Sequence, residues 1–365
     1  MNGPMHAEPD DRRDERDPND EPTGWLDLAR VVAIAAVVMV HEAGKGVGAR
    51  GPHDPATPGW WAAVVLDAAS RWCVPVFLMV SGALLLDPRR TDPPGVFYRR
   101  RAARIGVPLV VWTAGYLVFG HVYLGRPIGI RDVARAVGSG SPFMHLYYLY
   151  VIAGLYLLAP FLRETMRAVD RRARIGLGSV LLVIGMADQS LMTFVGIGEP
   201  NAATRFVPYL GYFVAGRLLR EVPPRPGSAR RAAVVAAASI AVTVAGGGLA
   251  AADGRGWGPY GEYAIGYLAP NVVVMSLAVF RLLHALGTRP HGWRPGPRTA
   301  RLAELTFGVY LVHAALWYPL VLHWHPPAAV GPYLLAAAWH WLVALAGAAA
   351  ITAVMRRIPL VRRLV

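Results

Sequence analysis

The chain has 365 residues, of which 55% are hydrophobic and only 16% are charged, and its mean hydropathy is +0.36. This balance excludes an ordinary soluble domain of that size and is typical of a membrane protein. The single cysteine, Cys73, excludes an internal disulfide and a cysteine-based metal cluster.

Residues 1–24 are charged and proline-rich without an apolar stretch, which predicts a disordered tail rather than a signal peptide. Apolar runs of about membrane length follow, and they predict an all-α integral membrane protein, a bundle of about ten transmembrane helices. The runs are residues 25–44, 61–86, 105–124, 142–162, 175–194, 206–219, 232–252, 263–286, 302–322 and 332–355. The predicted membrane domain is therefore 25–355, followed by a basic tail over 356–365.

The position of the basic residues explains the net charge of +14. The even-numbered connections and the C-terminal tail carry 25 Lys and Arg residues, and the odd-numbered connections carry 7. By the positive-inside rule, both termini and the even loops are predicted to be cytoplasmic, in a multi-pass protein of the plasma (inner) membrane. The basicity is thus topological, and we expect no nucleic-acid partner.

The first apolar run contains two ionisable residues, Arg30 and His41, eleven positions apart. A helix turns 100° per residue, so the two side chains share one face and lie roughly 16 Å apart along the axis. Ionisable groups at membrane depth are costly and usually mark a polar pathway or a reaction site. Glu42 is the neighbouring carboxylate, but adjacent helical residues point about 100° apart, which argues against its orienting His41.

A second cluster joins the second and third runs. The segment VPVFLMVSGALLL contains Pro75, which can kink a helix or free a carbonyl, and the small residues Ser81 and Gly82, which permit close helix approach. Arg101 and Arg104 then share a face at the membrane surface. Two such guanidinium groups suit a multiply phosphorylated ligand, and the alternative is that they anchor the helix to lipid headgroups.

Other polar residues at membrane depth have structural alternatives. Asp67 and Arg71 are four apart and favour a structural ion pair. His313 and, more weakly, His145 either line a substrate path or pack as buried histidines. No metal-ligand spacing is present, and we expect no metal.

The sequence resembles the acyltransferase-3 family of integral-membrane O-acyltransferases, which modify envelope and secreted glycans. The resemblance rests on six motifs that recur in order over residues 25–355. They are WLDLARVVAIAAVVMVH, VPVFLMVSGALLL, the Arg-x-x-Arg of Arg101 and Arg104, HLYYLYVIAGLYLLAPFLR, YLGYFVAGRLL and LTFGVYLVHAALW. The sequences of the second and fourth of these motifs look most like the enterobacterial-common-antigen acetyltransferase branch. The chain resembles the stand-alone form of the family, without a fused periplasmic domain.

The resemblance implies acyl-CoA, most simply acetyl-CoA, as donor substrate, a glycan or glycolipid acceptor on the outer side, and His41 as the catalytic histidine. Arg30 joins His41 in the catalytic set, Ser81 joins Arg101 and Arg104 in the donor set, and Arg71 joins the two other histidines along the substrate path. The residues alone leave open whether His41 is a base or a nucleophile. The rival hypothesis is a polysaccharide or glycolipid transporter, and homo-oligomerisation stays open.

Overall fold

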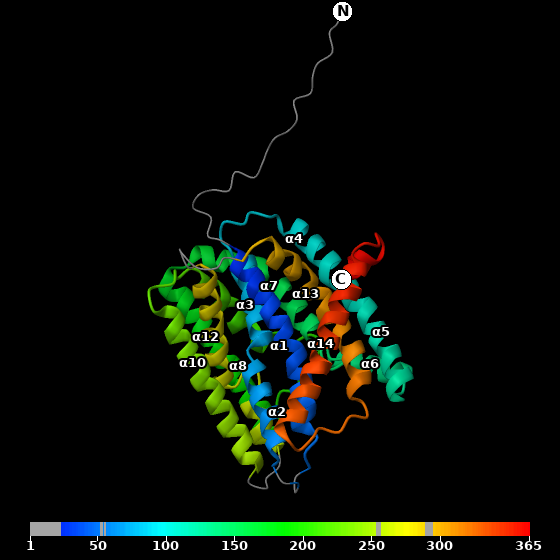
Figure 1. Ribbon diagram of the computed structural model, residues 1–365. Helices are drawn as coiled ribbons and strands as arrows, with labels where there is room; N and C mark the ends of the chain where they lie inside the picture. Colours follow the sequence, from blue (N-terminus) through cyan, green and yellow to red (C-terminus); the bar gives the residue numbers. More distant parts are fainter. Residues whose placement is uncertain (1–22, 52–53, 55, 253–256, 289–294) are drawn as a thin grey trace, which may run out of the picture.

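The computed structural model describes residues 23–51, 54, 56–252, 257–288 and 295–365. Its regular secondary structure is helical, which confirms the predicted all-α class (Figure 1). The predicted N-terminal tail lies almost entirely outside the described residues.

Eight helical segments of the described chain are long and apolar enough to cross a membrane. Three of them are composite: α2 continues into α3, α4 continues through the π-helical turn η1 into α5, and α10 ends in the π-helical turn η3. The segments are α1 (Gly24–Gly48), α2 (Pro58–Ser70) with α3 (Cys73–Leu85), α4 (Pro94–Arg101) with η1 (Ala102–Gly106) and α5 (Val107–Leu124), α7 (Tyr147–Ala168), α8 (Arg171–Val195), α10 (Ser228–Thr243) with η3 (Val244–Leu249), α12 (Pro270–Gly287) and α14 (Val330–Met355).

Two predicted spans do not reach this standard, so the count of ten stays a prediction. The sixth corresponds to α9 (Leu210–Arg220), which is too short, and the ninth to α13 (Pro297–Val321). Helix α13 has 25 residues but is more polar, because it carries His313 and several hydroxyl-bearing side chains. The remaining short elements are α6 (Ile130–Gly138), η2 (Val207–Tyr209), α11 (Gly258–Ala264) and η5 (Val361–Leu364).

Proline explains two helix boundaries. The predicted run 263–286 is divided, because α11 ends at Ala264 and α12 begins at Pro270, whose missing N–H and fixed φ suit the first helical position. The second predicted run breaks between Ser70 and Cys73. A proline ring clashes with the carbonyl four residues before it, so Pro75 disfavours a continuous helix at Arg71. This break places Arg71 at a joint between α2 and α3.

Close packing holds α3 against α9. A Cβ atom at Gly82 would overlap the Phe213 carbonyl, and a Cβ atom at Gly216 would overlap the Met79 carbonyl. The two backbones therefore approach as closely as helices joined by small residues do in membranes. This contact positions the C-terminal end of α3, where the loop toward α4 begins.

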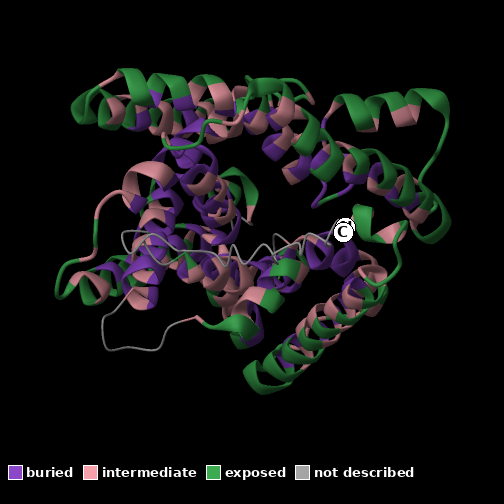
Figure 2. Ribbon diagram, turned by 90° about the horizontal axis from the view of Figure 1, so that it is seen from above, coloured by how far each residue is buried: buried purple, intermediate pink, exposed green. Residues whose placement is uncertain are grey.

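The outer surface of the bundle is apolar. Val110, Leu335 and Leu360 are more than two-thirds exposed, and Figure 2 shows the exposed residues on the outward faces of the peripheral helices. A soluble monomer rarely exposes so much apolar surface, whereas lipid covers it at no cost. Figure 1 shows the C terminus at the end of the bundle where α1 begins and α4 lies. The start of α1 and the C terminus thus lie at one end of the bundle, and the cytoplasmic placement of the two termini stays a prediction.

Candidate active site

A cavity of about 310 Å³ opens among α1, α3, η1, α7 and α13. We call it the arginine cavity, because Arg30, Arg90, Arg101 and Arg104 all line it. Its lining also includes three other residues singled out from the sequence, which are His41, Ser81 and His145. Residues separated by more than a hundred positions in the sequence thus border one space.

A second cavity, of about 460 Å³, lies on the other side of His41. We call it the lysine cavity, because Lys45 lines it together with Arg71 and several aromatic side chains. Three residues line both cavities: His41, Tyr147 and Tyr267. The imidazole of His41 therefore lies at the junction of the two spaces and is accessible from each.

The ring of His41 is surrounded by other rings. Its centroid is 5.2 Å from that of His313, 5.8 Å from that of Trp317 and 6.4 Å from that of His145. His41 forms no hydrogen bond with a described residue, so both of its nitrogens are available to a substrate. The described residues contain no group of His, Cys, Asp and Glu that could hold a metal ion, despite this clustering.

Glu42 does not orient His41. Its carboxylate is fully buried and accepts hydrogen bonds from Trp317 Nε1 at 2.8 Å and from His340 Nδ1 at 3.1 Å. These contacts tie α1 to α13 and α14. Because Trp317 also packs against His41, Glu42 supports the site through the indole rather than by direct contact.

His313 has a defined tautomer. Its Nδ1 lies 3.0 Å from the carbonyl oxygen of Val309, which can only accept, so the proton is on Nδ1 and Nε2 carries the lone pair. That Nε2 atom is buried without a hydrogen-bond partner in the described residues, as are both ring nitrogens of His145. Buried polar atoms are normally paired, so such a concentration marks a place where a ligand or water belongs.

The hydroxyl of Tyr147 is a further unpaired group. It is buried and has no hydrogen-bond partner among the described residues, and the side chain borders both cavities. The neighbouring Tyr310 and Tyr116 differ, because their hydroxyls donate to the carbonyls of His145 and Leu311 at 2.6 and 2.7 Å. Tyr147 therefore presents a free donor at the junction.

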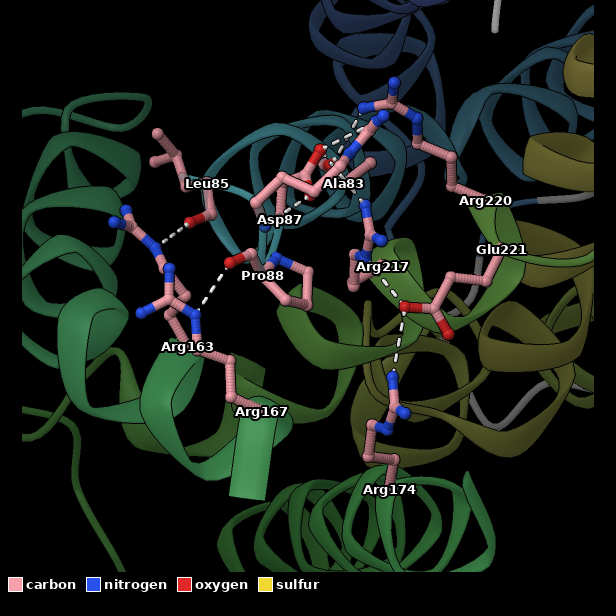
Figure 3. Close-up of polar contacts among 11 residues, drawn as sticks. Ala83, Leu85, Asp87, Pro88, Arg163, Arg167, Arg174, Arg217, Arg220 and Glu221 are labelled. Carbon is pink, nitrogen blue, oxygen red and sulfur yellow. Dashed lines mark hydrogen bonds and ion pairs between the residues drawn. The ribbon is translucent and has the colours of Figure 1, made fainter. Parts of the chain in front are cut away.

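Several arginines near the arginine cavity have structural partners. Figure 3 shows them around the end of α3, where Arg163 and Arg220 donate to the carbonyls of Leu85 and Ala83. A cation near a helix C terminus satisfies carbonyls that lack an intrahelical partner. The others pair with carboxylates or loop carbonyls: Arg167 with Pro88, Arg174 with Glu221, and Arg217 with Glu221 and Asp87.

Arg101 and Arg104 differ from this group because neither pairs with a carboxylate in the part of the chain that the structure describes. Arg101 packs over the rings of Phe97 and Tyr156, and its Nε is buried without a partner. Arg104 lies in the π-helical turn η1, a type of irregularity frequent at functional sites. By contrast, Arg30 pairs with Asp27 at 2.8 Å. The two free guanidinium groups face the same cavity, which agrees with the shared face expected from their spacing.

The structure brings the eight sequence-predicted site residues into one region. Six line the arginine cavity, Arg71 lines the lysine cavity, and His313 stacks on His41. Sequence reasoning missed Lys45, Tyr147, Tyr267 and Trp317. The tyrosines and the tryptophan occur in ordinary aromatic runs, and only the four-residue interval from His41 marks Lys45 as sharing its helix face.

Fold and site together define a multi-pass helical membrane protein with two cavities that meet at a histidine. The family model described as the acyltransferase domain (Acyl_transf_3) matches residues 23–357. The chain therefore belongs to the acyltransferase-3 family and is a membrane acyltransferase. Neither the curated proteins nor the solved structures contain a match to it.

Proposed function

We propose that this protein is a membrane O-acyltransferase of the plasma (inner) membrane. It moves an acyl group, most simply acetyl, from cytoplasmic acyl-CoA to a hydroxyl of an envelope glycan or glycosylated metabolite on the outer side. The observation that carries the proposal is the meeting of two cavities at His41, because a donor and an acceptor can then reach one imidazole from opposite directions.

The arginine cavity is the proposed donor site. The planar guanidinium groups of Arg101 and Arg104 can each donate two hydrogen bonds to a phosphate of CoA. Ser81 and Arg30 also line this cavity. The rise from Arg30 to His41, roughly 16 Å along α1, is comparable with an extended pantetheine arm. Phosphates bound near η1 thus leave the thioester within reach of His41.

The reaction needs a base for the incoming hydroxyl, and imidazole is the side chain whose ordinary pKa is nearest neutrality. The acceptor oxygen bonds to the thioester carbonyl carbon while His41 takes the hydroxyl proton. The carbon–sulfur bond then breaks, and the proton passes to the departing CoA thiolate. A two-step route, in which His41 first takes the acyl group and CoA leaves before the acceptor attacks, gives the same products.

Tyr147 supplies the proposed electrophilic assistance. A free donor at the junction is suited to the carbonyl oxygen of the thioester, on which negative charge develops in the transition state. His313 and His145 line the path beside His41, with unpaired ring nitrogens available to the acceptor hydroxyl or to water.

The test is acceptor-dependent release of free CoA by the purified protein in detergent, with the acylated product identified by mass spectrometry. We expect His41→Ala to lower turnover by at least about 10²-fold while the protein stays folded. His325→Ala, at an exposed histidine beyond α13, is the matched control and should keep full turnover. A transporter would release no CoA, and wild-type turnover by His41→Ala would remove the imidazole from the reaction.

A further inference from the structure

Lysine occurs once in the chain, at position 45, whereas arginine occupies the other 36 basic positions. Lys45 follows His41 by four residues on α1, so the two side chains share a face and lie about 6 Å apart along the axis. It lines the lysine cavity and forms neither an ion pair nor a hydrogen bond with a described residue. The cavity therefore contains an uncompensated ammonium group one helical turn from the reacting imidazole.

Arg71 adds hydrogen-bond donors to the same space. Its Nε and Nη2 atoms donate to the two oxygens of Asp67 at 2.8 and 2.6 Å, and Asp67 is fully buried. The Nη1 atom has no hydrogen bond to a described residue, although Arg71 lines the lysine cavity. The ion pair fixes the guanidinium plane and leaves one edge for a ligand.

The charge around the lysine cavity is positive. Its lining contains Lys45 and Arg71 but no Asp or Glu. Asp67 is occupied by Arg71, and Glu42 by Trp317 and His340. The unpaired ammonium group of Lys45 and the free edge of Arg71 make this lining electropositive, which favours a ligand with a negative charge.

The rest of the lining is aromatic. Tyr147, Tyr267, Trp317 and Tyr318 border the cavity, and Met144 lies among them. Aromatic rings with polar edges present large rigid faces together with hydrogen-bonding tips, which suits the apolar face and hydroxyl rim of a sugar ring. The cavity thus combines a surface for a sugar with two cations in its lining.

We propose that the lysine cavity binds an acceptor glycan through an anionic group, a carboxylate or a phosphate, that lies close to the hydroxyl to be acylated. This inference rests on the proposed function and names the substrate class of its acceptor site. Lys45 supplies the unpaired charge, and Arg71 supplies an oriented donor. One helical turn between Lys45 and His41 places the anion about one sugar ring from the reacting oxygen.

The first experiment compares acceptors that differ in the charged or uncharged group at C6 of the sugar. Methyl glucuronide, its uncharged methyl ester and methyl glucoside 6-phosphate are used with the wild type, Lys45→Met and Lys45→Glu, and kcat/KM is measured from CoA release. We expect the wild type to prefer a charged acceptor roughly tenfold, Lys45→Met to lose that preference, and Lys45→Glu to favour the ester. The carboxylate and phosphate arms show which anion is preferred. Arg131→Met, at an exposed arginine of α6, should keep the wild-type preference.

Equal use of the glucuronide and its ester by the wild type would overturn this inference and leave the proposed function intact. So would an equal loss on both acceptors in Lys45→Met, which would give the ammonium a role other than recognising charge. Absence of acceptor-dependent CoA release with every acceptor would instead contradict the proposed function.

A second measurement needs no variant. Because Lys45 is the only lysine, the rate at which an amine-reactive ester modifies the Lys45 peptide reports this site in the wild type. We expect methyl glucuronide or the sugar phosphate to slow the modification and the methyl ester to leave it unchanged. Protection by phosphatidylglycerol vesicles alone, with no further effect of either sugar, would assign the anion to a lipid headgroup and overturn the acceptor inference, as would equal protection by both glucuronide forms.

Discussion

At the scale of single residues, the site is recognisable by polar atoms that lack partners. Tyr147 Oη, His313 Nε2 and both nitrogens of His145 are buried and unpaired in the described structure. Each such atom costs about 1–3 kcal/mol when nothing satisfies it. Their gathering around His41 is explained if a substrate or water occupies the junction during turnover.

Tyr147→Phe separates a chemical from a structural role of this hydroxyl. Removal of an unpaired buried hydroxyl leaves the free energy of unfolding unchanged or slightly higher. Loss of a donor to the developing oxyanion lowers kcat on the order of 10²-fold. The measurements are CoA release and thermal unfolding in detergent.

Tyr98→Phe is the control with the opposite expected outcome, a loss of stability without a loss of turnover. Its hydroxyl donates to the Leu157 carbonyl at 2.8 Å, so its loss lowers stability by about 1 kcal/mol while turnover per folded molecule is retained. Full activity of Tyr147→Phe would contradict the assignment of Tyr147 as the donor to the acyl carbonyl.

At the scale of elements, irregular joints position the functional side chains. The break between α2 and α3 lies at Arg71, and the π-helical turn η1 carries Arg104. Regular helices on either side hold these joints in place. Close packing of α3 on α9 holds the helix that follows the first joint, because it leaves no room for even a methyl group at Gly82 or Gly216.

Arg101→Lys and Arg104→Lys test the donor site. Lysine keeps the charge but lacks the planar fork, so we expect acyl-CoA affinity to fall about tenfold for each variant. Isothermal titration with acyl-CoA measures the change. Arg99→Lys, at an exposed neighbour outside the cavity, should bind as the wild type does. Unchanged affinity in all three would show that the pair serves only as a membrane anchor.

Gly216→Ala tests the contact between α3 and α9. The added methyl group would overlap the Met79 carbonyl, so the helices must separate, at a cost of about 1–3 kcal/mol in stability. Gly176→Ala on α8 meets no atom within 4 Å and should be neutral or stabilising, since alanine favours a helix. The measurement is the melting temperature of each variant in detergent, which we expect to be lower for Gly216→Ala than for Gly176→Ala. Equal melting temperatures would refute the close approach.

At the scale of the whole molecule, the helical bundle contains two cavities that meet at the imidazole of His41. The arginine cavity and the lysine cavity approach His41 from different directions, and apolar surface surrounds the bundle. The cations differ accordingly. Arg101 and Arg104, without a carboxylate partner among the described residues, border the first cavity, and Lys45 with Arg71 borders the second. The arrangement suits transfer of a small group while both larger molecules stay on their own sides.

Much of this architecture could be predicted from the sequence, because hydropathy and helical periodicity are local properties. They predicted ten spans, eight of which correspond to membrane-length helical segments of the described chain, and the shared faces of Arg30 with His41 and of Arg101 with Arg104. Pairing is not local: that Glu42 holds Trp317 and His340 depends on how α1, α13 and α14 pack. The missing hydrogen bond of the Tyr147 hydroxyl could not be predicted from the sequence either, because it depends on which acceptors the packed neighbours place near the hydroxyl.

The most direct test of the central claim is acyl transfer across a sealed membrane. Proteoliposomes of one orientation are selected with an impermeant thiol reagent against a cysteine introduced at Thr91, in an exposed loop predicted to be cytoplasmic. Radiolabelled acetyl-CoA is supplied on that side and an acceptor glycan only on the other. We expect label on the opposite-side acceptor and one free CoA per acyl group where the donor was added. Movement of intact glycan without CoA release, or label confined to an acceptor on the donor side, would contradict the account.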